Sequence, residues 1–313
     1  MKSNLSRSTL FRRIGITLLL FIITAAAVLA MRWGKVIVET TDQTRSPFPS
    51  DAEEVVFTIC TYNVQARPLF DETKNKFAHI SPLLNRFDIC ALQECFKDYR
   101  RAWAAAEHSS KIFHGTLKHP LKLVGSGLSL LSSLPLISTD NINFDTCGEF
   151  QNRPASKGVL LGRYQAGAMT LDVYTTHIEA GGSPQALAAR KGQGEEIVDF
   201  VNAQSPPENS VIILGDFNMR PSRGPEDKEK HKDNPKVYVF DWIKETLDLR
   251  DASDEFNGPV SKEIDRILFR PGKGCAMKVL HWQQDDPDFY YADGKTPLSD
   301  HAPLFARFQL ERS

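Results

Sequence analysis

The chain has 313 residues, a hydrophobic content of 41% and a formal net charge of −1 at pH 7. This apolar content is sufficient for a packed core and excludes a disordered chain. The near-neutral charge provides no global basic field of the kind that usually accompanies nucleic-acid binding, although it is compatible with a local basic groove. No Cys-x-x-Cys pair occurs among the five cysteines, so we expect no zinc site.

An uncharged apolar run at 14–31 follows a basic N-terminal stretch and predicts a transmembrane helix. Because only basic charges precede the run, the positive-inside bias keeps the N-terminus cytoplasmic and places the rest of the chain across the membrane. The alternative is a cleaved signal peptide and a secreted protein, since 28–30 resembles a small-residue cleavage site. We therefore expect an anchor or signal segment at 1–31, a linker at 32–54 and one catalytic domain at 55–313.

Short β-rich segments and helical segments follow from residue 55 onward. We expect strands at 55–62, 88–92, 127–132, 157–163, 168–175 and 210–214, three later strands at Asp265, near Val279 and at 304–310, and helices at 74–85, 97–107, 184–203 and 237–247. Because the two kinds of element do not alternate strictly, the pattern favours two packed sheets with helices outside over a doubly wound parallel sheet. The charged stretch 219–236 is predicted to be a solvated loop, with a role at the rim of a substrate site as the alternative.

Acidic, amide and imidazole groups stand at the ends of these strands. They are Asn63, Glu94, His177 and the pair Asp216 and Asn218 in a Gly-Asp-Phe-Asn turn. Polar groups gathered at the mouth of an α/β sheet are what a metal-assisted phosphoryl site requires. Glu94 can supply an oxygen ligand to Mg²⁺, and of Asp216 and Asn218 one can orient a water molecule while the other holds a phosphate oxygen. Alone, Asn63 would more often be a turn former and His177 a structural residue. A helix cap is the alternative for Glu94, and a plain turn is the alternative for Asp216 and Asn218.

An aspartate and a histidine, Asp300 and His301, adjoin just before the last strand. An aspartate can fix the tautomer of an imidazole and raise its basicity, and the pair can then activate water against phosphorus. The sequence leaves open whether the orienting carboxylate is Asp300 or Asp265. Lys157 precedes a strand and can stabilise developing charge on phosphoryl oxygens, whereas alone it would be a surface lysine.

Taken in order, these motifs resemble those of the endonuclease/exonuclease/phosphatase superfamily, whose members share a DNase-I-like fold. The likeness extends over 55–310. It implies an α/β fold built as a four-layer α/β/β/α sandwich, and Mg²⁺-dependent hydrolysis of a phosphodiester or phosphomonoester, with Mn²⁺ as a possible substitute. By motif, it implies that Glu94 is the main metal ligand, supported by Asn63 and Asp300.

The same resemblance implies roles for the other polar residues. His301 corresponds to the general base, with Asp265 as its partner. Asp216 and Asn218 correspond to the pair that orients water and phosphate, and His177 to a contact for the phosphate or the transition state.

Three further stretches resemble the neutral sphingomyelinases of this superfamily. They are Gly-Ser-Gly-Leu at 125–128, Ser-Lys-Gly around Lys157, and Arg-x-x-Gln at Arg190 and Gln193. One position departs from the pattern, because Asn152 stands where mammalian members carry an aspartate five residues before the lysine. An asparagine cannot form an ion pair with Lys157, so the likeness does not extend to a regulatory pair.

The sequence therefore predicts a membrane-anchored, Mg²⁺-dependent phosphodiesterase that acts on a phospholipid head group. Tethering holds an active site at the bilayer, which fits a lipid substrate. An exported nuclease acting on DNA or RNA, a phosphatase acting on phosphomonoesters and a catalytically inactive binding module remain as alternatives. The sequence implies no protein partner.

Overall fold

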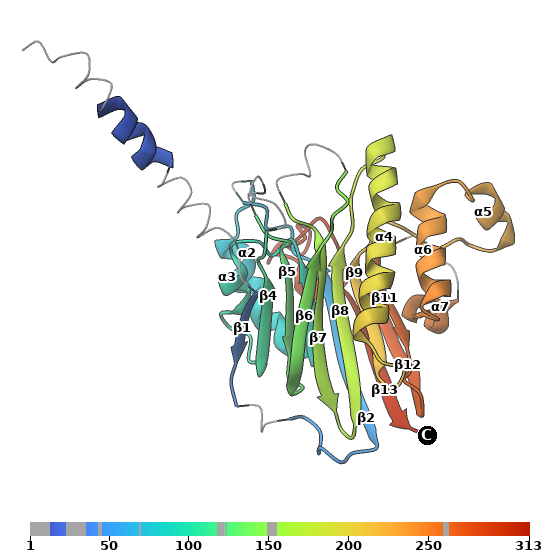
Figure 1. Ribbon diagram of the computed structural model, residues 1–313. Coiled ribbons are helices and arrows are strands. Elements are labelled where there is room, and N and C mark those ends of the chain that lie inside the picture. The colour runs from blue at the N-terminus through green and yellow to red at the C-terminus, as the bar shows by residue number, and fades with distance from the viewer. Residues whose placement is uncertain are drawn as a thin grey trace, which may run out of the picture.

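Two β-sheets pack face to face, and helices cover both outer faces of the pair (Figure 1). The computed structural model describes residues 13–22, 36–42, 46–68, 70–117, 122, 124–148, 155–258 and 263–313. The α/β arrangement of two sheets is the one that the mixed order of strands and helices predicts.

Seven strands form the first sheet in the order β1-β4-β5-β3-β2-β13-β12. In that order they are Val36–Thr40, Ser110–His114, Leu128–Ser132, Ile89–Gln93, Glu54–Asn63, Leu304–Arg312 and Cys275–Gln284. Only β2 and β3 are parallel to each other within this sheet. Their carboxyl ends lie side by side, with Asn63 opposite Gln93.

Six strands form the second sheet in the order β10-β11-β9-β8-β7-β6. In that order they are Arg250–Asp251, Asp265–Arg270, Ser210–Asp216, Met169–His177, Gly158–Ala166 and Leu136–Asn143. Here β8 and β9 are the parallel pair, and they end together with His177 opposite Asp216. Each sheet therefore delivers polar side chains at the carboxyl ends of one parallel pair.

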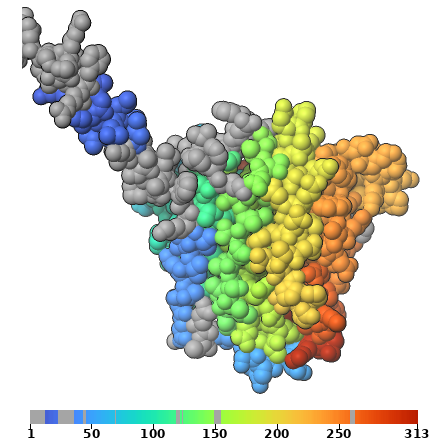
Figure 2. Space-filling view, in the orientation of Figure 1, coloured from blue at the N-terminus to red at the C-terminus, as the bar shows by residue number. Residues whose placement is uncertain are grey.

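Helices cover the outer face of each sheet. On the first sheet lie α2 (Lys74–Leu83), a 3₁₀ turn (Leu84–Arg86) and α3 (Tyr99–Trp103), and on the second lie α4 (Pro184–Gln204) and α6 (Pro235–Thr246). The short helices α5 (Pro225–Lys230) and α7 (Ala252–Asn257) and a 3₁₀ turn (Pro287–Phe289) occur in connections. Figure 2 shows α4 beside the region of α5 and α6 on one face of the molecule.

The middle layer between the sheets is the largest apolar core. It includes Leu160 and Val173 from the second sheet and Phe308 from the first, all fully buried. Two further clusters fill the spaces beneath α2 and α3 and beneath α4 and α6. Burial of each such side chain contributes about 1.5–3 kcal/mol, so packing of the sheets against each other dominates the stability of the fold.

Several elements differ from the sequence prediction, among them the helix α5 within the loop predicted at 219–236. The helix expected at 97–107 ends at Trp103, because Ser81 accepts the N–H of Ala105 at 2.8 Å and Asn85 accepts that of Glu107 at 2.8 Å. These bonds replace the helical partners of the alanine run and turn the chain into β4. Residues 36–40, within the predicted linker, form the edge strand β1. The strands β4 and β6 are also additional to the prediction, because their sequences show no clear alternation of polar and apolar residues.

The N-terminal prediction falls partly outside the described residues. Residues 13–22 are helical, whereas 23–31 are not described. Within the described ranges, no helix combines the length and apolar content needed to cross a bilayer.

His108 should make the fold sensitive to acid. Its ring is 3% exposed and lies 2.8 Å through Nε2 from the carbonyl oxygen of Phe87. Burial lowers the pKa of His108 to about 4, whereas an unfolded histidine has a pKa of about 6.5. The unfolded state therefore binds more protons between these values, and stability falls as pH drops through that window.

Replacing His108 by glutamine should flatten this dependence in urea unfolding between pH 7 and pH 4, by up to about 3 kcal/mol at 1.4 kcal/mol per pKa unit. His79→Gln provides the control, since it makes the same substitution at an exposed histidine. An unaltered slope for His108→Gln would contradict the assignment.

Candidate active site

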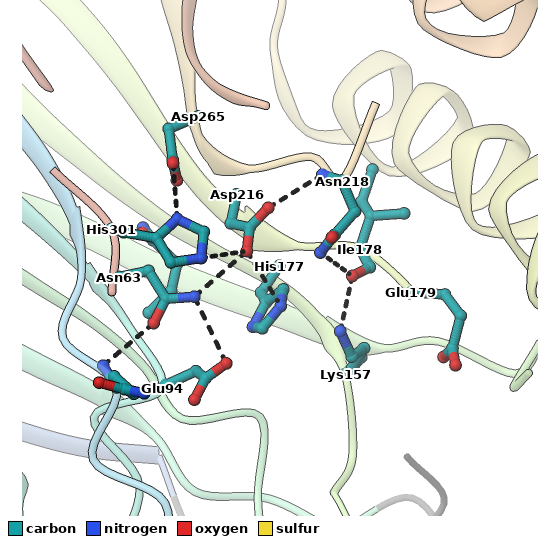
Figure 3. A network of polar contacts seen from close by, with 12 residues as sticks. Asn63, Glu94, Lys157, His177, Ile178, Glu179, Asp216, Asn218, Asp265 and His301 are labelled. Atoms are coloured by element: carbon teal, nitrogen blue, oxygen red, sulfur yellow. Dashed lines mark hydrogen bonds and ion pairs between the residues drawn. The ribbon is translucent and has the colours of Figure 1, made fainter. Parts of the chain in front are cut away.

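Polar side chains from both sheets meet at the ends of the parallel strand pairs (Figure 3). The first sheet contributes Asn63 from β2 and Glu94, which directly follows β3. The second contributes His177 and Asp216 from the ends of β8 and β9. The structure thus gathers groups that are far apart in the sequence into one network.

Asp216 is the hub of this network. Its Oδ2 accepts a hydrogen bond from Asn63 Nδ2 at 3.2 Å and lies 3.3 Å from His177 Nε2. Asn63 Nδ2 also lies 3.4 Å from Glu94 Oε1. Burial and the charge of Asp265 raise the pKa of Asp216, while His301 and Lys157 oppose that rise. The contact between Asn63 and Asp216 joins the two sheets directly.

His301 and Asp265 form a second contact across the sheets. Asp265 begins β11, and its Oδ2 lies 2.7 Å from His301 Nδ1 in the turn before β13. A carboxylate oxygen accepts, so Nδ1 keeps its proton and Nε2 is the nitrogen that gains or loses one. Burial alone lowers the pKa of His301, but the hydrogen bond and charge of Asp265, aided by Asp216 and Asp300, raise it to about 9.

The structure therefore selects between the two carboxylates that the sequence left open. Asp265 contacts the imidazole, whereas the exposed Asp300 accepts a hydrogen bond from Gln65 Nε2 at 2.9 Å. Asp300 nevertheless stays at the mouth of the site, because Ser299 donates to the carbonyl of Asn63 at 2.6 Å.

Positive backbone φ angles direct several of these side chains into the site. Alternation along β3 would send Gln93 and Glu94 to opposite faces of the sheet, but Glu94 has φ = 55° and the chain turns there. Asn218 and Gln65 have φ = 50° and 45°. For residues with a side chain this conformation costs on the order of 1–2 kcal/mol each, so strain is concentrated at the site.

The group around Glu94 has the donor set that Mg²⁺ prefers. Glu94 Oε2 is buried and has no hydrogen-bond partner among the described residues, and burial raises the pKa of this carboxyl group. An oxygen in this condition, close to the amide of Asn63, fits a hard cation. Glu94, with Asp300 at the mouth, would hold the ion. Asn63 would join them through Oδ1 only with its amide turned over, because Nδ2 faces Glu94 and Oδ1 accepts the N–H of Gln65 at 3.1 Å.

A second group could also supply ligands to a metal. Oxygen or nitrogen atoms of Asp216, Asp265 and His301 lie within 4.8 Å of one another. The hydrogen bond between His301 and Asp265 already uses one ligand atom of each residue, and Mg²⁺ prefers oxygen to imidazole nitrogen. We therefore interpret this group as the acid–base part of the site.

Asn218 and Lys157 converge on one backbone carbonyl. Asn218 Nδ2 donates to the carbonyl of Ile178 at 3.1 Å, and Lys157 Nζ donates to the same oxygen at 2.6 Å. The N–H of Asn218 also donates to Asp216 Oδ1 at 2.9 Å. Burial lowers the pKa of Lys157, while Asp216 and other acids oppose the decrease. The lysine thus lies beside the site and fixes the loop after His177.

Two of the segments that resemble the neutral sphingomyelinases support the site from outside it. Gln193 accepts the N–H of Glu179 at 2.8 Å, and Arg190 donates to the carbonyl of Gly181 at 2.7 Å, so α4 holds the loop after His177. Gly127, with φ = 71°, accepts the N–H of Cys95 at 2.8 Å. Asn152 lies outside the described residues.

A buried hydroxyl–amide brace beneath the site was not predicted from the sequence. Gln93 Nε2 donates to Thr175 Oγ1 at 3.0 Å and to Thr61 Oγ1 at 3.0 Å. Thr175 belongs to the second sheet and the other two to the first, so the brace links the sheets. Its only sequence signal is a glutamine at the end of an otherwise apolar strand.

Known proteins share this architecture. The sphingomyelinase of Mycobacterium tuberculosis is 24% identical over 282 residues, which covers 83% of this chain and 54% of the relative. Sphingomyelin phosphodiesterase 2 of Rattus norvegicus is 25% identical over 227 residues, or 61% of this chain and 49% of the relative. The chain thus spans about half the length of these relatives.

Among solved structures, a magnesium-bound Staphylococcus aureus beta toxin mutant superposes with a TM-score of 0.57 at 17% identity, over 80% of this chain and 99% of the toxin. This likeness confirms the DNase-I-like fold. The sequence pattern of the Endonuclease/Exonuclease/phosphatase family matches residues 60–301. With that match over most of the chain, and with the site in place at its strand ends, the chain belongs to the endonuclease/exonuclease/phosphatase family.

Proposed function

We propose that the protein is a Mg²⁺-dependent phosphodiesterase that hydrolyses the head-group bond of a phospholipid, in the manner of a sphingomyelinase. The observation that carries the hydrolytic part is the His301–Asp265 pair, which leaves a basic nitrogen facing Asp216 at 3.8 Å. Similarity to two sphingomyelin-degrading relatives supports the lipid part.

The chemistry of the proposed reaction follows from the proton positions. His301 Nε2 takes a proton from a water molecule as the water oxygen attacks phosphorus, while Asp265 holds the ring in place. The bond from phosphorus to the lipid alcohol oxygen breaks, and that oxygen takes up a proton from water as it leaves. Asp216 orients the same water. When bound, Mg²⁺ supplies positive charge beside the phosphoryl oxygens.

A neutral donor faces the phosphate in this arrangement. Burial lowers the pKa of His177 well below its ordinary value, with further lowering by Lys157 and His301. A neutral ring can donate from one nitrogen only, and His177 uses that donor toward Asp216, whose Oδ2 lies 3.3 Å from its Nε2. The amide of Asn218 is then the neutral donor for a phosphoryl oxygen whose charge grows in the transition state.

We also propose that the apolar run at 14–31 tethers the catalytic domain to a membrane, with the domain on the extracytoplasmic side. The basic flank before the run supports this orientation. Alkaline extraction of membranes tests the tether, because a chain that keeps the apolar run stays in the membrane pellet and a chain from which it has been cleaved is released.

Substrate class is tested with the full chain, Mg²⁺ and three substrates in parallel: sphingomyelin vesicles, supercoiled plasmid DNA and a soluble phosphomonoester. Release of phosphocholine without nicking supports the lipid proposal. Nicking without lipid cleavage would assign a nuclease, and hydrolysis of the monoester alone a phosphatase. Chelation by EDTA should stop the reaction and Mg²⁺ or Mn²⁺ should restore it; turnover that survives chelation would contradict the role of the metal.

The brace beneath the site should affect metal use as well as stability. Replacing Thr175 by valine leaves the buried Gln93 donor without one partner, which costs about 1–3 kcal/mol. We expect turnover to fall on the order of tenfold and half-activation to need more Mg²⁺, because Gln93 precedes Glu94. Thr175→Ser should retain both properties.

Thr170→Val on the same strand is the matched control, since this threonine lies at the far end of β8. If Thr175→Val unfolds more easily but shows unchanged Mg²⁺ activation, the brace has a structural role only.

A further inference from the structure

A pocket of about 270 Å³ adjoins the active site. It lies between α4, the loop after β8 and the segment that leads from β9 into α6. Its described lining residues are Gly181, Arg190, Asn218, Met219, Arg220, Asn234, Lys236, Val237 and Ile264. Asn218 belongs to both places, because its N–H is bonded to Asp216 and its side chain lines the pocket. A group in the pocket would therefore lie next to the reacting phosphate.

The wall formed by 219–236 is held in place by the protein itself. The N–H of Arg220 donates to the carbonyl of Lys236 at 2.9 Å, so the two ends of this segment are joined. Arg220 is also fixed by a two-pronged pair with Asp227, at 2.6 and 3.2 Å. The pocket is thus preformed, which reduces the entropy that a ligand would lose on binding.

Charge in the pocket is positive. Three cationic residues, Arg190, Arg220 and Lys236, line it, and none of its described lining residues is acidic. Asp227 balances Arg220 from outside the lining. Lys236 is half-buried, and its ammonium group forms no hydrogen bond or ion pair with the described part of the chain. Burial and then the charge of Arg190 lower the pKa of Lys236.

We propose that this pocket receives an anionic group of the substrate other than the phosphate that is cleaved, with Lys236 as the specificity-determining residue. The substrates would then be phospholipids whose head group carries a second negative charge. The proposal rests on the proposed phospholipid phosphodiesterase function and makes it more specific. A choline head group bears a positive charge and would be repelled by the same residues.

Two lipids that differ by one phosphate provide the test. Full-length protein with Mg²⁺ is assayed on phosphatidylcholine vesicles that contain either phosphatidylinositol or phosphatidylinositol 4-phosphate, at equal mole fraction. We expect kcat/KM for the monophosphorylated head group to be higher on the order of tenfold, the effect of one charge-assisted hydrogen bond. Lys236→Met should remove that preference, so that the two lipids are cleaved with equal kcat/KM.

Lys244→Met is the matched control, because Lys244 is on the same helix but outside the pocket. Lys236→Glu should reverse the preference. Equal rates on the two lipids in the wild type, or a preference that persists in Lys236→Met, would overturn the proposal.

A binding measurement tests the pocket independently of the proposed phospholipid phosphodiesterase function. Inositol 1,4-bisphosphate is titrated in EDTA by calorimetry, where no turnover occurs, and we expect binding that Lys236→Met weakens on the order of tenfold. Binding that is equal in both proteins would overturn the pocket assignment. Hydrolysis of sphingomyelin alone would refute the pocket while supporting the lipid function, whereas cleavage of no lipid would refute both.

Discussion

Replacing Glu94 by glutamine should abolish Mg²⁺-dependent turnover without weakening the fold. The wild-type carboxylate is half-buried, and its Oε2 has no hydrogen-bond partner among the described residues. A neutral amide removes the cost of burying that charge, so unfolding in EDTA should need as much urea as the wild type or more. Activity should fall about a thousandfold, because metal stabilisation of the transition state is worth several kcal/mol.

Glu195→Gln provides the control, since Glu195 is exposed on α4 and pairs only weakly with Lys191, at 4.0 Å. Mg²⁺ titrations of kcat and urea curves measured with and without metal distinguish the two effects. Near-normal turnover in Glu94→Gln would show that Glu94 is not the metal ligand.

Removing the imidazole of His301 should reduce activity by a similar factor. General-base catalysis contributes about 10²–10⁴-fold, so His301→Ala should lose activity in that range while it still binds Mg²⁺.

Asp265→Asn keeps the side-chain size but loses the charge that orients and polarises the ring of His301. We expect an intermediate loss in kcat with little change in KM, because Asp265 does not contact substrate.

The pH profile of Asp265→Asn distinguishes positioning from a merely structural effect. His301 works as a base only when neutral, so kcat/KM should rise with pH through its pKa. Asp265 helps to raise that pKa in the wild type. Without the aspartate charge the pKa falls, and the rising limb should shift to lower pH even though the maximum rate is smaller. A limb that does not move would argue against the pairing.

Much of the scaffold follows from local patterns. The long helix expected at 184–203 is α4 at Pro184–Gln204, and the strand expected at 210–214 is β9 at Ser210–Asp216. Buried strands carry continuous apolar runs, and proline at the first helical turn marks a helix start, so these signals are strong. The polar residues at strand ends could be found for the same reason, since they interrupt apolar runs.

Contacts between residues from distant segments could not be predicted from local sequence patterns. The choice of Asp265 over Asp300 for His301 depends on β11 pairing with β9, which brings Asp265 opposite Asp216. Edge strands such as β6 have weak alternation because their pairing, not their composition, orders them. The brace at Gln93 and the pocket at Lys236 likewise join segments that no local pattern connects.

The catalytic groups are divided between two sheets whose described strands form no ladder with each other. Asn63 and His301 come from one sheet, and their partners Asp216 and Asp265 from the other. A sliding movement of one sheet by about 1 Å can cost on the order of 100-fold in rate. A substitution in the apolar middle layer, for example at Leu160, can therefore lower turnover by shifting the sheets even where both stay folded.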